Sequence, residues 1–498
     1  MSKTIIKEEN STPEVNINDE RDVRIKKLQD LREMAVNPYP PDAKKENTIT
    51  EALQKKVGEV VNIAGRIMMK REFGKLTFCH LQDESGRIQV AFKFDEVGED
   101  NYKLFVKKID IADIISVTGE RFTTHKGEES ILVKKWTLLS KALLPLPDKF
   151  HGLQNEELRL RKRYLDLLLN PELREVFRRK AKFWSSLRNF LVNEGFLEVE
   201  TPALETTAGG ADAAPFTSHH NALDMNVYLR ISMGELWQKR LMIAGFEKTF
   251  EIGRQFRNEG MSREHLQDYT QMEFYWAYAN YEQGMNIVEK MYKYILKETF
   301  NTLKFDIGEF KDIDMEKKWE KIDYAKTIKE KTGIDILKAD EKAIKDKLGR
   351  LKIHYEKHDG KGRLIDSLWK MCRKSIAGPV FLINHPVEVS PLAKRKTDNP
   401  ALTERYQIII AGSELGNGYS ELNDPIDQAE RFREQTKMRE AGDTEAQMHD
   451  YDFVEALEHG MPPTTGFGLS ERVFSFFENK PIRECQLFPL VKPENIIK

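Results

Sequence analysis

Two stretches in the middle of the chain alternate between apolar and polar residues, which limits them to half-buried β-strands. The first runs from Phe250 to Arg257, and the second is DYTQMEFYWAYA, which starts at Asp268. Because side chains alternate between the two faces of a strand, each run has one apolar and one polar face. The runs are close in sequence and are joined by a Gly-containing link, so they are predicted to pair as a hairpin.

The polar faces of this hairpin gather groups that bind charged ligands. They carry Glu251, Gly253, Gln255 and Arg257 on the first run, and Tyr269, Gln271, Glu273 and Tyr275 on the second. Another arginine, Arg472, ends the Gly-rich segment GFGLSER near the C-terminus. Guanidinium groups bind phosphates, acids hold metal ions, and aromatic rings stack on bases. The pattern therefore predicts an enzyme that uses a nucleotide.

Length and composition limit the class of protein further. A chain of 498 residues should form two or three domains, and its 40% hydrophobic and 32% charged residues are typical of a soluble protein. The net charge of −2 leaves any nucleic-acid contact to local basic patches. There is no run of about 18 apolar residues and no signal-like start, and Cys79, Cys372 and Cys485 are far apart. These features predict no membrane partner, no disulfide framework and a cytoplasmic location.

The N-terminal region is predicted to be disordered over residues 1–18 and helical from Asp19 to about Val36. Arg21, Arg24 and Lys27 recur at a spacing of three, so they share one side of that helix. This side is either a solvated charged face or a surface that contacts phosphates. The second interpretation requires that the next domain bind nucleic acid.

The following region is predicted to form a small closed barrel. VVNIAGRIMMKREFGKLTFCHLQDESGRIQVAF has three β segments separated by Gly74 and Ser85-Gly86, and IADIISVTGERFTTH and ESILVKKWTLL add two more. Five short strands suit a Greek-key barrel such as the oligonucleotide-binding (OB) fold.

Polar and aromatic residues of this barrel form a candidate RNA-binding face. Arg71, Phe78, His80 and Gln89 are expected on its second and third strands, and Glu128 in a later loop. An aromatic ring beside polar groups can stack a splayed base and read its edge. Taken alone, Phe78 is slightly better explained as a residue of the barrel core.

The remainder of the chain lacks a regular alternation of strands and helices. No G-x-G-x-x-G or P-loop sequence opens a helix, which argues against a Rossmann or P-loop core and favours an antiparallel sheet flanked by helices. The predicted fold is therefore α+β and multidomain. Its parts are a disordered start and basic helix (1–56), an OB-fold barrel (57–143), a Pro-punctuated hinge (144–160) and a catalytic domain (161–498) with a Lys-rich helical insertion at about 301–370.

Six segments between about Val23 and Pro493 resemble the class II (subclass IIb) lysyl-tRNA synthetases. GFLEVETPAL is similar to motif 1 of that family, FRNEG with MEFY to motif 2, and GFGLSER to motif 3. GGADAAPFTSHHNALD, HPVEVSPLAKRKTDNPALTERY and GSELGNGYSELNDPIDQAERF are similar to stretches of the lysine subgroup. The resemblance implies a class II catalytic domain, a homodimer formed through motif 1, and an anticodon-binding barrel that uses the five residues of the candidate RNA-binding face.

A lysine–tRNA ligase is the activity that this resemblance implies. Such an enzyme activates L-lysine with ATP to lysyl-adenylate and pyrophosphate, and then transfers lysine to the 3′ end of tRNA(Lys). The attacking carboxylate and the α-phosphate repel one another, so catalysis consists mainly of neutralisation and positioning. The implied catalytic residues are Arg257, Glu259 and Arg472, and the implied ATP-binding residues are these three with His265, Tyr269 and Glu414.

The resemblance also assigns a lysine pocket, whose implied residues are Gly210, Glu235, Arg257, Glu273, Tyr275, Asn417, Tyr419 and Glu421. A buried ammonium group needs acids to compensate its charge and an aromatic wall for its methylene stem. Glu421 and Tyr275 would receive the ε-ammonium group, and Tyr419 would pack against the stem.

Mg²⁺ is the implied cofactor, with Glu414 and Glu421 as its carboxylate ligands. The family commonly carries another metal-binding acid where this chain has Gln407. Because phosphates and waters complete the Mg²⁺ octahedron, dependence on Mg²⁺ is still expected. Two further departures are Met233-Gly234, where a proline usually precedes the acid, and Gly466–Arg472, which is one residue shorter than usual.

Three alternatives to a lysine–tRNA ligase that binds tRNA(Lys), ATP and L-lysine remain open at this stage. A ligase for aspartate or asparagine should place a cation where Glu421 stands. A ligase that modifies a protein with lysine should lack the barrel. A non-catalytic RNA-binding protein should have lost Arg257, Glu259, Glu414 or Arg472, and all four are present.

Overall fold

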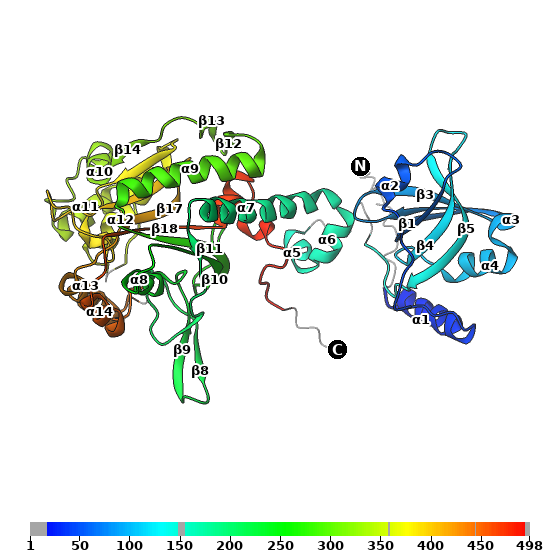
Figure 1. Ribbon diagram of the computed structural model, residues 1–498, viewed down its shortest axis with the longest axis horizontal. Coiled ribbons are helices and arrows are strands. Elements are labelled where there is room, and N and C mark those ends of the chain that lie inside the picture. The colour runs from blue at the N-terminus through cyan, green and yellow to red at the C-terminus, as the bar shows by residue number, and fades with distance from the viewer. Residues whose placement is uncertain (1–16, 148–154, 357–358, 444, 494–498) are drawn as a thin grey trace, which may run out of the picture. The chain divides into compact units, whose positions relative to one another are not determined.

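The computed structural model describes residues 17–147, 155–356, 359–443 and 445–493. The chain forms two compact units, residues 1–171 and 172–498 (Figure 1). Residues 1–16 of the predicted disordered start and the centre of the predicted hinge lie outside the described residues, whereas residues 17 and 18 already belong to a helix. Among the described helices, none has the length and apolar character that crossing a bilayer requires.

The first unit contains a closed five-stranded barrel with the strand order β1-β2-β3-β5-β4. Its strands are β1 (Val60–Phe73), β2 (Leu76–Gln82), β3 (Arg87–Lys93), β4 (Ile114–Thr123) and β5 (Glu129–Ser140). Its helices are α1 (Ile17–Glu33), α2 (Ile49–Gln54), α3 (Phe94–Val97), α4 (Glu99–Lys108), α5 (Glu156–Arg161) and α6 (Arg163–Leu169). The predicted barrel is confirmed, including the turns at Gly74 and Ser85-Gly86.

Helix α1 uses its basic side within the unit. Arg24 is buried and donates to the carbonyl oxygen of Ile111 at 3.0 Å, and Nζ of Lys27 lies 2.6 Å from Oδ1 of Asp110. The sequence left open whether this side contacts phosphates. Because Arg24 and Lys27 are already paired with the barrel, they do not form a free phosphate-binding surface.

The second unit is built on an eight-stranded sheet with the order β14-β15-β16-β17-β18-β11-β10-β6. These strands are β6 (Leu197–Glu198), β10 (Lys248–Phe256), β11 (Asp268–Ala277), β14 (Glu320–Asp323), β15 (Val380–Ile383), β16 (Arg405–Ile410), β17 (Ser413–Ser420) and β18 (Thr464–Ser470). Smaller sheets contain β7 (Leu204–Glu205), β8 (Thr217–His220), β9 (Met225–Leu229), β12 (Lys304–Ile307) and β13 (Phe310–Asp314). The inner pairs are antiparallel, as predicted, whereas the edge pairs β14–β15 and β10–β6 are parallel.

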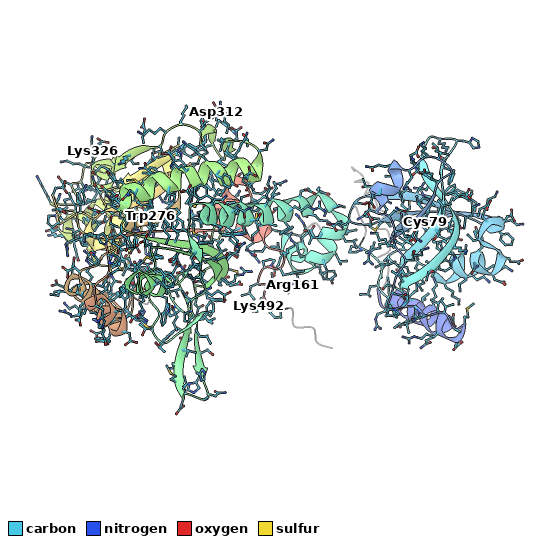
Figure 2. The ribbon with its side chains drawn as sticks, viewed as in Figure 1. Cys79, Arg161, Trp276, Asp312, Lys326 and Lys492 are labelled. Atoms are coloured by element: carbon cyan, nitrogen blue, oxygen red, sulfur yellow. The ribbon has the colours of Figure 1, made fainter. Side chains whose placement is uncertain are left out.

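Helices cover both faces of the large sheet. They are α7 (Arg174–Asn193), α8 (Glu235–Ile243), α9 (Tyr281–Phe300), α10 (Tyr324–Thr332), α11 (Glu341–Arg350), α12 (Lys361–Cys372), α13 (Pro425–Glu440), α14 (Tyr451–Glu458) and α15 (Arg472–Phe477). One core joins α7 and α9 to Phe250, Met272 and Phe274 of the sheet, and another joins α8, α13 and α14 to Tyr275 and Tyr419. Figure 1 shows α9 lying along the sheet, and Figure 2 shows Trp276 of β11 in the same unit.

The Lys-rich stretch at about 301–370 differs from its prediction. It was expected to be helical, but it begins with β12, β13 and β14 and becomes helical only from Tyr324 onward. Strands β12 and β13 form a small sheet of their own, whereas β14 pairs with β15 and so belongs to the large sheet. Lysines occupy exposed positions there and conceal the alternation of Phe305, Ile307 and Ile313, which are buried.

Candidate active site

The polar face of the β10–β11 hairpin forms one wall of the site. Gln255 pairs with Tyr269, Gly253 with Gln271, and Glu251 with Glu273, so the faces predicted from alternation coincide in the observed register. Arg257 follows β10 directly, and its backbone N–H donates to the carbonyl oxygen of Gln267 at 2.8 Å. The hairpin therefore holds its charged residues on a paired, rigid support.

A cavity of about 400 Å³ lies against this wall in the second unit. Strands β17 and β18, the start of α8 and the segments around Gly210 and Ser390 supply its other sides. The predicted site residues that line it are Gly210, Glu235, Arg257, His265, Tyr269, Glu273, Tyr275, Glu414, Asn417, Tyr419, Glu421 and Arg472. Glu259 is half-buried and does not line the cavity. Segments that are more than 200 residues apart in the sequence thus meet here.

Two of the predicted arginines, Arg257 and Arg472, line the cavity. Nε of Arg257 donates to the carbonyl oxygen of Ile231 at 3.2 Å, and Cζ lies 5.9 Å from the centre of the Tyr269 ring. Arg472, at the start of α15, forms an ion pair with Glu264. Neither guanidinium forms a bidentate pair with a carboxylate in the described residues, so each retains donors for an anionic ligand.

His265 lines the cavity and directly follows Glu264, the ion-pair partner of Arg472. Its Nδ1 is 2.7 Å from Oγ of Ser262. Burial, together with the positive charge of Arg472, lowers the pKa of His265 from its usual value. The imidazole is therefore neutral at pH 7 and suits a hydrogen-bonding role.

The inner end of the cavity collects three carboxylates, Glu235, Glu273 and Glu421, each about 5% exposed or less. Burial, reinforced by the charge of Glu235, raises the pKa of Glu273 to about 7. Tyr275 donates to Oε2 of Glu273 at 2.9 Å, and the Met233 N–H donates to Oε1 at 2.9 Å. Burial of several negative charges is costly unless cations compensate them, so this end of the cavity is suited to a cationic ligand.

Sequence analysis missed Lys239, which lies beneath this acidic end. Its side chain is fully buried, and Nζ lies 2.8 Å from Oε1 of Glu235 and 2.6 Å from Oε2 of Glu421. Glu235 and Lys239 are four residues apart on α8, a spacing that pairs opposite charges on a helix. That spacing could have indicated the first contact, whereas Glu421 is remote in the sequence.

Arg405 is a second functional candidate that the sequence analysis missed, and it orients a predicted residue. It lines the cavity, and its Nε donates to Oδ1 of Asn417 at 2.8 Å. Its Nη1 contacts the carbonyl oxygen of Val389 and lies 3.2 Å from Oγ of Ser390. The side-chain amide of Asn417 is therefore turned so that its nitrogen remains available.

Gln407 ties the predicted metal ligand Glu414 to a buried histidine. Its Nε2 donates to Oε1 of Glu414 at 2.6 Å, and its Oε1 lies 3.0 Å from Nε2 of His385. Burial lowers the pKa of His385 far below its usual value, so this ring is neutral and donates to the Gln407 oxygen. Among the described residues, Oε2 of Glu414 accepts no hydrogen bond, and Glu414 lines the cavity. Among the described residues there is no cluster of three or more acidic, histidine or cysteine ligands.

Glycines explain how the departures from the family pattern fit the site. Gly234 has φ +66°, and a Cβ atom there would lie 2.2 Å from Oγ1 of Thr201. This turn places Glu235 at the start of α8, facing the cavity. A Cβ atom on Gly466 would lie 2.2 Å from Oε1 of Glu421 and 2.6 Å from the Tyr275 ring. Glycine at position 466 therefore keeps the acidic end open.

The barrel of the first unit brings the candidate RNA-binding residues to one face. Arg71 pairs with Phe78 across β1 and β2, and His80 pairs with Gln89 across β2 and β3. Nε2 of His80 lies 2.9 Å from Oε1 of Glu128. Arg71 is on β1, so its predicted place on the second or third strand was wrong, because β1 extends as far as Phe73.

Phe78 lies on the outer side of β2. The strand alternates between buried and half-buried residues, and Phe78 and His80 are half-buried, whereas Cys79 is fully buried. Figure 2 marks Cys79 within the barrel. The interpretation of Phe78 as a barrel-core residue was therefore wrong, and its ring is available at the surface.

Comparison with known proteins agrees with this arrangement. Residues 155–492 match the family model described as tRNA synthetases class II (D, K and N), and residues 61–139 match an OB-fold nucleic acid binding domain. A protein named lysine–tRNA ligase from Thermoanaerobacter sp. (strain X514) is 46% identical over 482 residues, which cover 95% of this chain and 96% of the relative. Proteins with the same name from Thermotoga maritima and Carboxydothermus hydrogenoformans are each 44% identical over 485 residues; the alignments cover 95% of this chain and 96% and 98% of the relatives. The chain therefore belongs to the class II tRNA synthetases, in the family that also contains the lysine–tRNA ligases.

Proposed function

We propose that this protein is a lysine–tRNA ligase, which joins L-lysine to ATP as lysyl-adenylate, releases pyrophosphate, and transfers lysine to the 3′ end of tRNA(Lys). The observation that carries this proposal is the acidic end of the cavity, where Glu235, Glu273 and Glu421 converge below Arg257. The names of the relatives support the same amino acid. Aspartate and asparagine have no cationic side chain that could compensate these acids.

Amino-acid activation would use the two arginines as the neutralising groups. Arg257 would bind the carboxylate of lysine and the α-phosphate of ATP at once, since its planar group offers several donors. Tyr269, beside Arg257, would stack on adenine. Arg472 would bind the opposite side of the nucleotide, and His265 its distal phosphates. These contacts would hold the carboxylate and the α-phosphate together against their mutual repulsion. That repulsion is the main barrier to adenylate formation.

Glu259 is proposed to act at the rim of the cavity, because it is not among the residues that line it. Burial, partly offset by Arg257, raises its pKa above the usual value. A role in holding the adenine edge would require the segment after β10 to close over ATP. Closing segments are common in enzymes that exclude water from a phosphate reaction.

In the lysine pocket, Glu421 and Tyr275 would receive the ε-ammonium group, and Tyr419 would pack against the methylene stem. Glu235, with the backbone at Gly210, would bind the α-ammonium group. Glu273 and Asn417 would complete the walls. All eight residues proposed to contact lysine, including Arg257 for its carboxylate, line one cavity.

Mg²⁺ fits the site through Glu414, whose Oε1 is held by Gln407 at 2.6 Å while the carboxylate still faces the cavity. Bound Mg²⁺ would supply charge neutralisation of the ATP phosphates, which with water complete its octahedron. Glu421 was predicted as a further ligand. Its Oε2 already contacts Nζ of Lys239 at 2.6 Å, which leaves Oε1 for a ligand, and the proposed ε-ammonium group of lysine would take that oxygen. We therefore assign the metal to Glu414 and reserve Glu421 for lysine.

In the barrel, Phe78 would stack an anticodon base, while Arg71, His80, Gln89 and Glu128 would read base edges and contact the backbone. The half-buried Phe78 ring supports this assignment, because stacking on an exposed aromatic ring is a common way to hold single-stranded RNA. We also propose a homodimer and a cytoplasmic location.

Aminoacylation tests this proposal directly. Purified protein should charge tRNA(Lys) with labelled lysine but not with aspartate or asparagine, and chelation with EDTA should abolish charging. Charging with aspartate, or with no amino acid, would contradict the proposal. Persistent lysine charging in excess EDTA would contradict the metal assignment alone.

A further inference from the structure

Lys239 has an unusual environment for a lysine, because its side chain is completely buried and both its ion-pair partners line the amino-acid cavity. Its Nζ lies between Oε1 of Glu235, at 2.8 Å, and Oε2 of Glu421, at 2.6 Å. The rings of Tyr419 and Phe453 are 5.5 Å and 5.9 Å from it. Lys239 itself does not line the cavity, so it can act on a ligand only through the acids.

The carboxylate of Glu421 divides its two oxygens between this lysine and the cavity. Oε2 is the oxygen that contacts Lys239. Oε1 points the other way, since a Cβ atom on Gly466, which lines the cavity, would lie 2.2 Å from it. Lys239 therefore fixes the orientation in which Glu421 offers one oxygen to the cavity.

The two carboxylate oxygens of Glu235 are also divided between Lys239 and the cavity. Oε1 is shared by Nζ of Lys239 and the hydroxyl group of Tyr419. These two contacts leave Oε2 as the oxygen that can serve a ligand. One internal cation thus orients two acids that come from different elements, α8 and the end of β17.

Lys239 also affects whether the acids around it are ionised. Glu235, Glu273 and Glu421 place three carboxylates in a buried space, and burial raises the pKa values of Glu273 and Glu421. The positive charge of Lys239 opposes this effect on Glu421. When all three acids are ionised, their charge together with that of Lys239 is −2, which matches the two ammonium groups of free L-lysine. Without Lys239, one acid would take up a proton, because like charges in a buried site cannot all remain ionised.

We propose that Lys239 is a specificity-determining positioning residue, which orients Glu235 and Glu421 and keeps both ionised, so that the cavity selects an amino acid with two ammonium groups. This inference rests on the proposed activation of lysine. It adds a requirement: the preference for lysine over an uncharged amino acid of similar length depends on a lysine of the protein itself.

The test compares wild-type protein with Lys239→Met in ATP–pyrophosphate exchange. Methionine keeps the length and removes the charge. We expect the KM for lysine to rise at least tenfold with little change in the KM for ATP, and the preference for lysine over norleucine to fall at least tenfold. As pH rises from 7 to 9, the KM of the variant for lysine should fall more steeply than that of wild type, because the protonated acid ionises.

Lys141 offers a matched control in the barrel. It is also fully buried, and its Nζ lies 2.6 Å from Asp110 and 2.8 Å from Asp113. Lys141→Met should reduce stability without changing the KM for lysine or the preference over norleucine. An unchanged preference in Lys239→Met, with wild-type exchange intact, would overturn the inference and leave the proposed function standing. Absence of lysine-dependent exchange in wild type would overturn the proposed function itself.

A crystal of wild-type protein with L-lysine tests the same inference if Lys239→Met does not fold. The ligand's ε-ammonium group should lie on Oε1 of Glu421 while Nζ of Lys239 stays on Oε2. Displacement of Lys239 by the ligand, or a ligand that does not contact Glu421, would contradict the proposed division of the carboxylate.

Discussion

At the scale of single residues, Glu421 carries the most weight for amino-acid choice. It is 2% exposed and lies between Lys239 and the cavity. Glu421→Gln keeps the shape and removes the negative charge. Loss of one partner from a buried charge pair costs about 2 to 5 kcal/mol, so we expect the KM for lysine to rise by roughly 30-fold or more. The KM for ATP should change far less, as pyrophosphate exchange would measure.

Glu289→Gln is the matched control for this substitution. Glu289 lies on α9 of the same unit, pairs with Lys293 at 2.6 Å, and is outside the cavity lining. Its replacement should leave both KM values unchanged. Equal losses of lysine and ATP affinity in Glu421→Gln would show that Glu421 supports the whole site and not the amino acid alone.

Gly466→Ala makes a complementary prediction at the same scale. The added methyl group would lie 2.2 Å from Oε1 of Glu421 and 2.6 Å from the Tyr275 ring, so both must move. We expect lysine-dependent exchange to fall at least tenfold while the protein remains folded by circular dichroism. Gly349→Ala on α11, where a Cβ atom meets nothing within 4 Å, should behave as wild type. Normal exchange in Gly466→Ala would contradict the assigned position of the ammonium group.

The role of a site residue could be predicted where it followed from a local pattern or motif. It could not be predicted where it depended on partners far away in the sequence. The polar face with Glu273 and Tyr275 follows from alternation along β11. The contact between Lys239 and Glu421 joins segments 182 residues apart, as their numbers show, and no local pattern encodes it. Gln407 was recognised as a departure, but its bond to His385 depends on the pairing of β15 with β16.

At the scale of elements, the alternation of apolar and polar residues predicted the strands more reliably than any other feature of the sequence. The five barrel strands and the β10–β11 hairpin have apolar and polar faces that the sequence displays directly. The parallel edge pairs were not predictable, because a strand of two to four residues such as β6 or β14 has too little alternation to reveal its partner. The sheet around the site was therefore foreseeable, and its edges were not.

The outer face of β2 gives the prediction that belongs to this scale. Phe78→Ala should weaken charging of tRNA(Lys) by about tenfold or more, since stacking of one base on an aromatic ring contributes about 1 to 3 kcal/mol. Pyrophosphate exchange does not involve tRNA and should stay near the wild-type rate. If both reactions fell together, with a lower unfolding temperature, Phe78 would be a structural residue of the barrel.

At the scale of the whole molecule, the chain contains two compact units, each with its own hydrophobic core and its own candidate site. In the proposed function, the barrel would bind RNA and the large sheet would support the site for ATP and lysine, so recognition of tRNA and chemistry would be carried by different units. The proposed homodimer would join two second units near β6, at the edge of the large sheet. Leu197 of β6 and Val192, near the end of α7, are 51% and 52% exposed, and a contiguous exposed apolar patch is typical of an interface.

Leu197→Lys tests the dimer. At micromolar concentration the wild-type protein should be dimeric and the variant largely monomeric, because the introduced lysine would have to lose its hydration on association. Light scattering after size-exclusion chromatography measures the change. Leu223→Lys, at an exposed leucine of the β8–β9 hairpin, is the control and should remain dimeric. A wild-type protein that is monomeric at every concentration would contradict the homodimer.

The most direct test of the central claim is ATP–pyrophosphate exchange by the wild-type protein with each of the twenty amino acids in turn. An acidic cavity beside Arg257 predicts exchange with L-lysine that exceeds exchange with every other amino acid by orders of magnitude. Faster exchange with aspartate, asparagine or an uncharged amino acid than with lysine would contradict the assignment of Glu235, Glu273 and Glu421 to a cationic substrate.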